Sequence, residues 1–210
     1  MNTFKTWVAA AAMLASAGAV SAAPVFQGRL ADGTASTTCT VSGTAKCAMF
    51  CDLSLDITIL KDWNIGRGSW SATAAAGSAQ ALAESAGAAQ TDFTGWFLPT
   101  GDGSKLAGAL NQYLSIWNDV GGSLAGLKAQ FDGVQSNFYW SGTEYAPNPN
   151  GARVFRTGGG EQVNFGKGIA MHAVAVRPGD VAASVPEPQT LALALLALGA
   201  AVVARRRRPV

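Results

Sequence analysis

The last 26 residues constrain the fold most, because they form a membrane-directed tail that is distinct in composition from the rest of the chain. The tail opens with Val185, Pro186, Glu187 and Pro188, and it closes with Arg205, Arg206, Arg207 and Arg208. Residues 190–204 carry no charge and would extend about 22 Å as a helix. A bilayer core is about 30 Å thick, so this predicted transmembrane helix is a short span that requires its arginines to snorkel. Arginine clusters stay cytoplasmic, which places the preceding residues outside.

A Val-Pro-Glu-Pro motif, an apolar segment and an arginine cluster, in that order, resemble the PEP-CTERM sorting signal of Gram-negative bacteria. The resemblance implies recognition by an exosortase and removal of the tail, so that contact with the membrane is transient. It also implies delivery to the cell surface or the extracellular matrix.

The amino terminus predicts export as well. Lys5 precedes an apolar stretch over residues 7–20, and small residues at 20–23 suit a signal peptidase. We therefore expect a signal peptide over 1–23, one extracellular domain over 24–184 (the body) and a sorting signal over 185–210.

The charge of the body excludes one class of partner. The whole chain has a net charge of +2, but Lys5 and the four terminal arginines belong to the processed segments. The body carries ten basic and twelve acidic residues, a net charge of −2. No basic surface for nucleic acid is expected.

Three cysteines lie near the start of the body. An exported chain meets an oxidising compartment, so one disulfide and one leftover thiol are expected. A turn at Ser42-Gly43 would place Cys39 opposite Cys47 and favours that pair. Zinc is not expected, because the spacing lacks a CxxC pair.

Periodicity predicts strands, then two helices, then more strands. Strands are expected at 25–30, 37–41, 93–98, 138–145 and 171–177, and a half-buried strand at 55–59. One helix should run from Trp70 to Ser85, after a cap at Ser69, and Gly87 should end it. A second helix should follow an apolar stripe formed by Leu106, Leu110, Tyr113, Leu114 and Trp117. Residues 153–156 and 162–165 should form a hairpin around three glycines. This order predicts an α+β domain with a mainly antiparallel sheet and two helices.

Four segments carry a second resemblance. They are Trp63-Asn64, residues 95–100 (Gly-Trp-Phe-Leu-Pro-Thr), residues 139–145 (Tyr-Trp-Ser-Gly-Thr-Glu-Tyr) and residues 175–180 (Ala-Val-Arg-Pro-Gly-Asp). In order and spacing they resemble the DUF1566 family, which is related to the carboxy-terminal domain of the Legionella collagen-like adhesin. Members usually have arginine where this chain has Phe97. The resemblance implies a C-type-lectin-like fold. Some relatives bind sulfated polysaccharides, and no catalytic residue set transfers.

The sequence does not favour an enzyme. Its only histidine, His172, lies among alternating apolar residues, so a structural role is favoured over a Ser-His-Asp triad. No spacing singles out a pair of carboxylates for glycoside hydrolysis.

One loop offers groups for a ligand. Tyr145 supplies an apolar ring face for a sugar, and Asn148, Asn150 and Arg153 supply hydrogen-bonding groups. Glu144 and the two asparagines also carry hard oxygen atoms, so calcium is the one cofactor the loop suggests, against the alternative of a water-exposed turn without metal. Trp140 is expected in the core, with sugar contact as the alternative.

We therefore expect an exported, non-enzymatic protein that binds or organises exopolysaccharide through residues 144–153. A structural matrix protein without a ligand is the alternative, and a polysaccharide-modifying enzyme has the least support.

Overall fold

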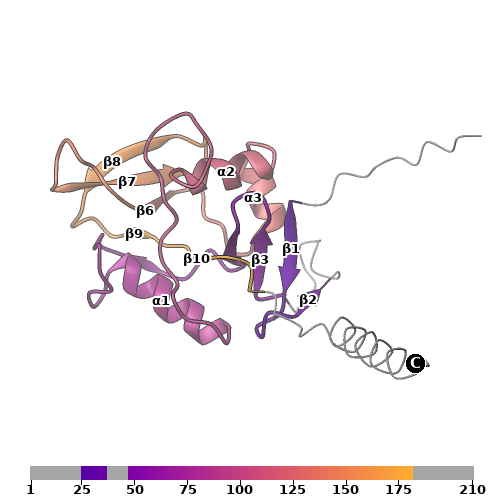
Figure 1. The fold of residues 1–210 in the computed structure, drawn as a ribbon. Coiled ribbons are helices and arrows are strands. Elements are labelled where there is room, and N and C mark those ends of the chain that lie inside the picture. Colours follow the sequence, from indigo (N-terminus) through magenta and orange to yellow (C-terminus); the bar gives the residue numbers. More distant parts are fainter. Residues whose placement is uncertain (1–24, 37–46, 182–210) are drawn as a thin grey trace, which may run out of the picture.

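The computed structural model describes residues 25–36 and 47–181, which form a mixed α+β structure (Figure 1). The helices are α1 (Ala79–Gln90), α2 (Gln112–Asp119) and α3 (Leu124–Gln130). The strands are β1 (Phe26–Arg29), β2 (Ala35–Ser36), β3 (Met49–Asp52), β4 (Ile57–Leu60), β5 (Arg67–Gly68), β6 (Phe138–Glu144), β7 (Gly151–Arg156), β8 (Gln162–Gly166), β9 (Met171–His172) and β10 (Val176–Pro178). The predicted signal peptide, the strand at 37–41 and the whole tail lie outside the described residues.

The strands form two sheets, in the orders β10-β4-β3-β1-β2 and β5-β9-β6-β7-β8. Every pairing is antiparallel except the short parallel contact between β6 and β9. The mainly antiparallel α+β prediction is confirmed. In the part of the chain that the structure describes, no helix combines the length and apolar character needed to cross a bilayer.

The first sheet is buried on both faces at its centre, where all residues of β3 and β4 are inaccessible. The prediction of a half-buried strand at 55–59 was therefore wrong at Thr58, whereas Asp56 is exposed as expected, in the turn before β4. Thr58 is fully buried, and its hydroxyl donates a hydrogen bond of 2.8 Å to the carbonyl of Gly179. That bond satisfies the hydroxyl, so burial is tolerated.

The second sheet contains the predicted hairpin, formed by β7 and β8, and the predicted aromatic strand β6. The predicted last strand is divided, because β9 pairs in the second sheet and β10 in the first. Its two faces are as expected. Met171, Ala173 and Ala175 enter one apolar cluster, while Val174 and Val176 enter the other.

The first helix begins nine residues later than predicted, at Ala79, with Ser78 as its cap. Gly87 does not end α1 but lies inside it, where an added Cβ would come within 2.2 Å of the Trp96 ring. The predicted strand at 93–98 is absent from the described chain. Only Phe97 of this segment pairs as in a strand, through two backbone hydrogen bonds of 2.8 Å with Val176. The side chain of Gln80 donates to the Trp96 carbonyl and accepts from the Leu98 N–H, both at 3.2 Å.

The second predicted helix is shorter than its apolar stripe. It starts at Gln112, and Leu106 and Leu110 remain 78% and 75% exposed in the preceding loop. The described residues contain three helices where two were predicted. The missed helix, α3, has only seven residues and a glycine at its centre, which gives little periodic signal.

Candidate functional site

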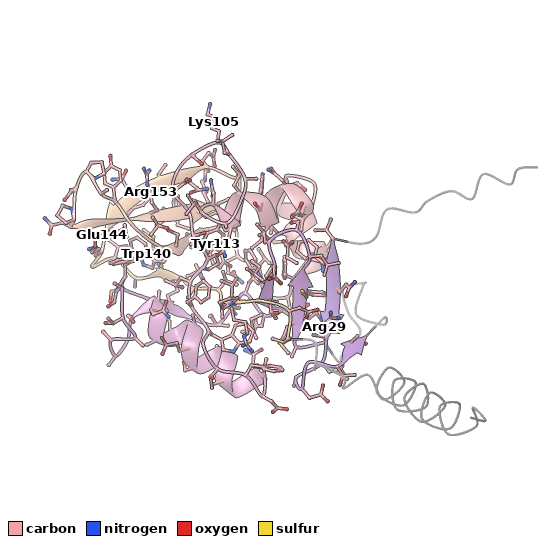
Figure 2. All side chains as sticks on the ribbon, in the orientation of Figure 1. Arg29, Lys105, Tyr113, Trp140, Glu144 and Arg153 are labelled. Atoms are coloured by element: carbon pink, nitrogen blue, oxygen red, sulfur yellow. The ribbon has the colours of Figure 1, made fainter. Side chains whose placement is uncertain are left out.

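The predicted ligand residues lie at and near the outer end of the β6–β7 hairpin, where Figure 2 shows Glu144 projecting from the body. Trp140, on the same strand, points inward and is fully buried. Its indole N–H donates to the carbonyls of Gly68, at 3.0 Å, and Ile169, at 3.1 Å. Trp140 is therefore a core residue, the favoured reading, and not a platform for sugar.

The hairpin loop, residues 145–150, is closed by its own hydrogen bonds. The N–H of Asn148 donates to the Tyr145 carbonyl, and the N–H of Gly151 donates to the Asn148 carbonyl, both at 2.9 Å. Asn148 Oδ1 also accepts from the N–H of Asn150 at 3.1 Å. These bonds are typical of an Asx turn, so part of the asparagine signal is explained by loop geometry.

Tyr145 and Arg153 are brought together. The Arg153 guanidinium carbon lies 4.6 Å from the centre of the Tyr145 ring, a cation–π contact. The same guanidinium lies against the backbone of Gly103, where an added Cβ would come within 2.6 Å of it. Both side chains are half-buried, so they form a fixed surface that still reaches solvent.

Asp102 lies in the electrostatic field of this surface. Burial acts to raise its pKa, but hydrogen bonds from Ser104 and the charge of Arg153 outweigh burial, and the pKa is lowered. Its carboxylate accepts from the Ser104 N–H at 2.8 Å. The sequence did not single out Asp102, because we expected a helix to begin close to it.

Glu144 does not join the Tyr145–Arg153 pair but forms an ion pair with Lys167. Their charged groups lie 2.7 Å apart, and the Lys167 ammonium is 4.4 Å from the centre of the Trp70 ring. The ammonium occupies the position beside the carboxylate that a cation would need. The described residues hold no cluster of three or more histidine, cysteine or acidic side chains suited to a metal ion. The calcium hypothesis thus gains no support from geometry.

A loop over residues 99–111 borders Arg153, and Lys105 projects from it (Figure 2). Gln162 on β8 fixes this loop, because its side-chain oxygen accepts from the Gly103 N–H at 3.0 Å while its amide donates to Asn111. A pocket of about 350 Å³ lies beside the loop. Its lining residues are Gly103, Ser104, Lys105, Leu114, Gly160, Glu161 and Gln162. No pattern in the sequence indicated that these distant segments meet.

His172 is placed as a structural residue. It is 8% exposed, and its ring centre lies 5.2 Å from that of Tyr139. Burial, with a smaller contribution from Arg67, lowers its pKa. Its Nδ1 has no hydrogen-bond partner among the described residues. No carboxylate in that part of the chain therefore accepts from Nδ1, as the acid of a triad would.

The cysteines have different states. Cys47 is disulfide-bonded, and Cys39, its predicted partner, lies outside the described residues. Cys51 is a free thiol that is fully buried on β3. Burial and the nearby Asp180 raise its pKa to about 12. It is therefore protonated and unreactive at neutral pH.

Comparison with protein families finds one match, the PEP-CTERM protein-sorting motif, over residues 184–208. The match covers the predicted Val-Pro-Glu-Pro segment, the apolar run and the arginine cluster. Such signals are recognised by exosortases, and they imply export and processing to the cell surface or the extracellular space. A comparison with curated proteins finds no match.

Proposed function

We propose that the body is a non-enzymatic domain that binds or organises exopolysaccharide at the cell surface or in the extracellular matrix. The observation that carries the proposal is the Tyr145–Arg153 pair on an exported chain. A sugar ring presents an apolar face and hydroxyl edges. An aromatic ring fixed beside a guanidinium offers the matching groups.

The charges near the pair favour neutral or mixed sugars. The body carries a net charge of −2, and Asp102 lies close to Arg153. Because the carboxylate partly neutralises the guanidinium, a polyanion would gain little attraction at this surface.

The resemblance of residues 63–180 to the DUF1566 family, and with it a C-type-lectin-like architecture, is part of the proposal. Four aromatic residues of its motifs, Trp63, Trp96, Tyr139 and Trp140, are buried, whereas Phe97 and Tyr145 are half-buried. The four buried residues therefore support a related fold and not a shared ligand site. Phe97, where relatives usually carry arginine, packs against the core.

Binding of the full-length chain, kept in detergent, to an array of diverse glycans tests the proposal. Tyr145→Ala should weaken binding to the recognised glycan about tenfold, since ring contact is lost. Leu53→Ala, a change in an exposed apolar residue of the turn between β3 and β4, is the matched control.

The rival functions give different results. A structural matrix protein without a ligand would bind none of the glycans. An enzyme would shorten or modify a polysaccharide on incubation, which size-exclusion chromatography of the sugar would reveal.

A further inference from the structure

A second pocket lies on the other face of the β7–β8 hairpin. Successive residues of a strand point to opposite faces, so Arg156 lies on the face opposite Arg153. Arg156 pairs across the sheet with Phe138, and Val163 pairs with Val154 on that same face. The second pocket is therefore separated from the Tyr145–Arg153 surface by the sheet itself.

The floor of this pocket is apolar and aromatic. The rings of Phe138 and Phe165 meet edge to face, with centres 5.1 Å apart, and both residues are half-buried. Val163 completes the floor and is 39% exposed. The volume is about 430 Å³, within the range of sites for small ligands. Its lining residues are Phe138, Arg156, Glu161, Val163, Asn164 and Phe165.

The rim of the pocket is polar but has no net charge. Arg156 and Glu161 form an ion pair at 3.6 Å, and both side chains are more than half exposed. Asn164 pairs with Arg153 on the opposite face, so its side chain does not contribute to this rim. A ligand suited to this lining has an apolar face for the floor and neutral donors and acceptors for the rim. An anionic ligand would have to compete with Glu161 for the guanidinium.

We propose that this pocket binds a segment of a neutral polysaccharide, as a second sugar site on the face opposite Tyr145. The inference rests on the proposed function and specifies its ligand as an uncharged saccharide. The Phe138–Phe165 floor packs against the ring faces, while Arg156 and Glu161 hydrogen-bond to hydroxyl groups.

The test uses the full-length chain in detergent with neutral glucose pentasaccharides in α-1,4, β-1,3 and β-1,4 linkage, and a heparin hexasaccharide as the anionic contrast. Isothermal titration calorimetry measures each affinity. Val163→Lys places a charge on the floor and should weaken binding of a neutral pentasaccharide at least about tenfold. Arg156→Ala, which leaves the aromatic floor intact but removes a rim donor, should weaken it about threefold.

Leu53→Lys is the matched control, because Leu53 is an apolar residue of similar exposure, 45%, outside the second sheet. It should bind as the unaltered chain does, and circular dichroism should show all three variants folded. Unchanged affinity in both Val163→Lys and Arg156→Ala overturns the inference while leaving the proposed function in place. Preference for the heparin hexasaccharide also overturns it. Absence of any glycan binding by the unaltered chain overturns the proposed function itself.

Discussion

The guanidinium of Arg29 is almost fully buried and pairs with a carboxylate 151 positions away. Its Nε and Nη2 donate to the two oxygens of Asp180 at 2.9 and 2.5 Å. The side chain of Arg29 is 4% exposed, and that of Asp180 is 28% exposed. This pairing raises the pKa of Arg29 despite the opposing effect of burial. A buried charge held in this way depends on its partner.

Replacement of Asp180 by asparagine should therefore destabilise the body. Arg29 would stay buried without its countercharge, and the free energy of unfolding should fall by about 2–4 kcal/mol. Urea unfolding followed by tryptophan fluorescence measures the change. Arg156→Gln breaks an exposed ion pair and serves as the control, with an expected loss below about 1 kcal/mol. Equal losses in the two variants would contradict this account of Arg29.

His172 should make stability depend on pH in a defined window. Its pKa is lowered in the folded state from the ordinary value of 6.5, mainly by burial. As the pH falls below about 6.5, the unfolded chain takes up a proton more readily than the folded chain, so stability declines. Above that pH, the histidine is neutral in both states and has no such effect.

Urea unfolding at intervals between pH 7.5 and pH 5 measures this dependence. His172→Gln removes the titrating group, and its stability should vary less across the window. A variant with the same slope as the unaltered chain would assign the pH dependence to other groups.

At the scale of elements, side-chain caps decided where the helices begin. The stripe from Leu106 to Trp117 has helical spacing, yet α2 starts only at Gln112. Asn111 caps it through Oδ1, and its amide donates to the Ser104 carbonyl at 3.0 Å. Gly108 has a φ of 149°, which does not continue a helix. The cap is a local contact with the N–H of Leu114, and the apolar period alone does not show that the helix begins there.

The difference in burial between the loop and α2 predicts how much each substitution along the apolar stripe lowers the free energy of unfolding. Leu106→Gln and Leu110→Gln, made together, should change the unfolding free energy by less than about 0.5 kcal/mol, because both side chains are exposed. Ile116→Ala in α2 should cost about 2–5 kcal/mol, since Ile116 is fully buried. Thermal unfolding compares the variants. A large loss in the Leu106/Leu110 variant would show that these leucines are packed.

The hairpin β7–β8 and strand β6 were predictable because turn residues and aromatic alternation are local signals. The strand predicted at 93–98 is reduced to a single bridge between Phe97 and Val176, because the flanking Trp96 and Leu98 backbone groups bond to the side chain of Gln80 on α1. Tertiary contacts also limited the prediction of the Tyr145–Arg153 surface. Local composition identified Tyr145 and Arg153, whereas Gln162 and Asp102 join them only through tertiary contacts.

At the scale of the whole molecule, local sequence predicted the destination of the chain better than its binding activity. The tail is a linear signal, and residues 184–208 match the sorting motif directly. A pocket assembled from β6, β7, β8 and the turn before β8 has no linear signature. The fold class was easier to predict than the pocket and harder than the sorting signal, because it follows from the order of the elements along the chain.

Substitution of Pro186, Glu187 and Pro188 by alanine should leave the protein unprocessed and retained in the membrane fraction. Exosortase recognition depends on the motif, while the apolar run and arginine cluster would still stop transfer. Immunoblots of membrane and medium fractions from the exporting cell measure the outcome. Gln189→Ala is the control, and normal release of the triple variant would refute the assignment.

The Arg29–Asp180 pair also determines how the body would respond to force. Asp180 lies five residues before Val185, so a pull on a membrane-held tail reaches this ion pair almost at once. The pair passes the load from the end of β10 to β1, across the two strands between them. A force applied through the tail should therefore load β10 and β1 together.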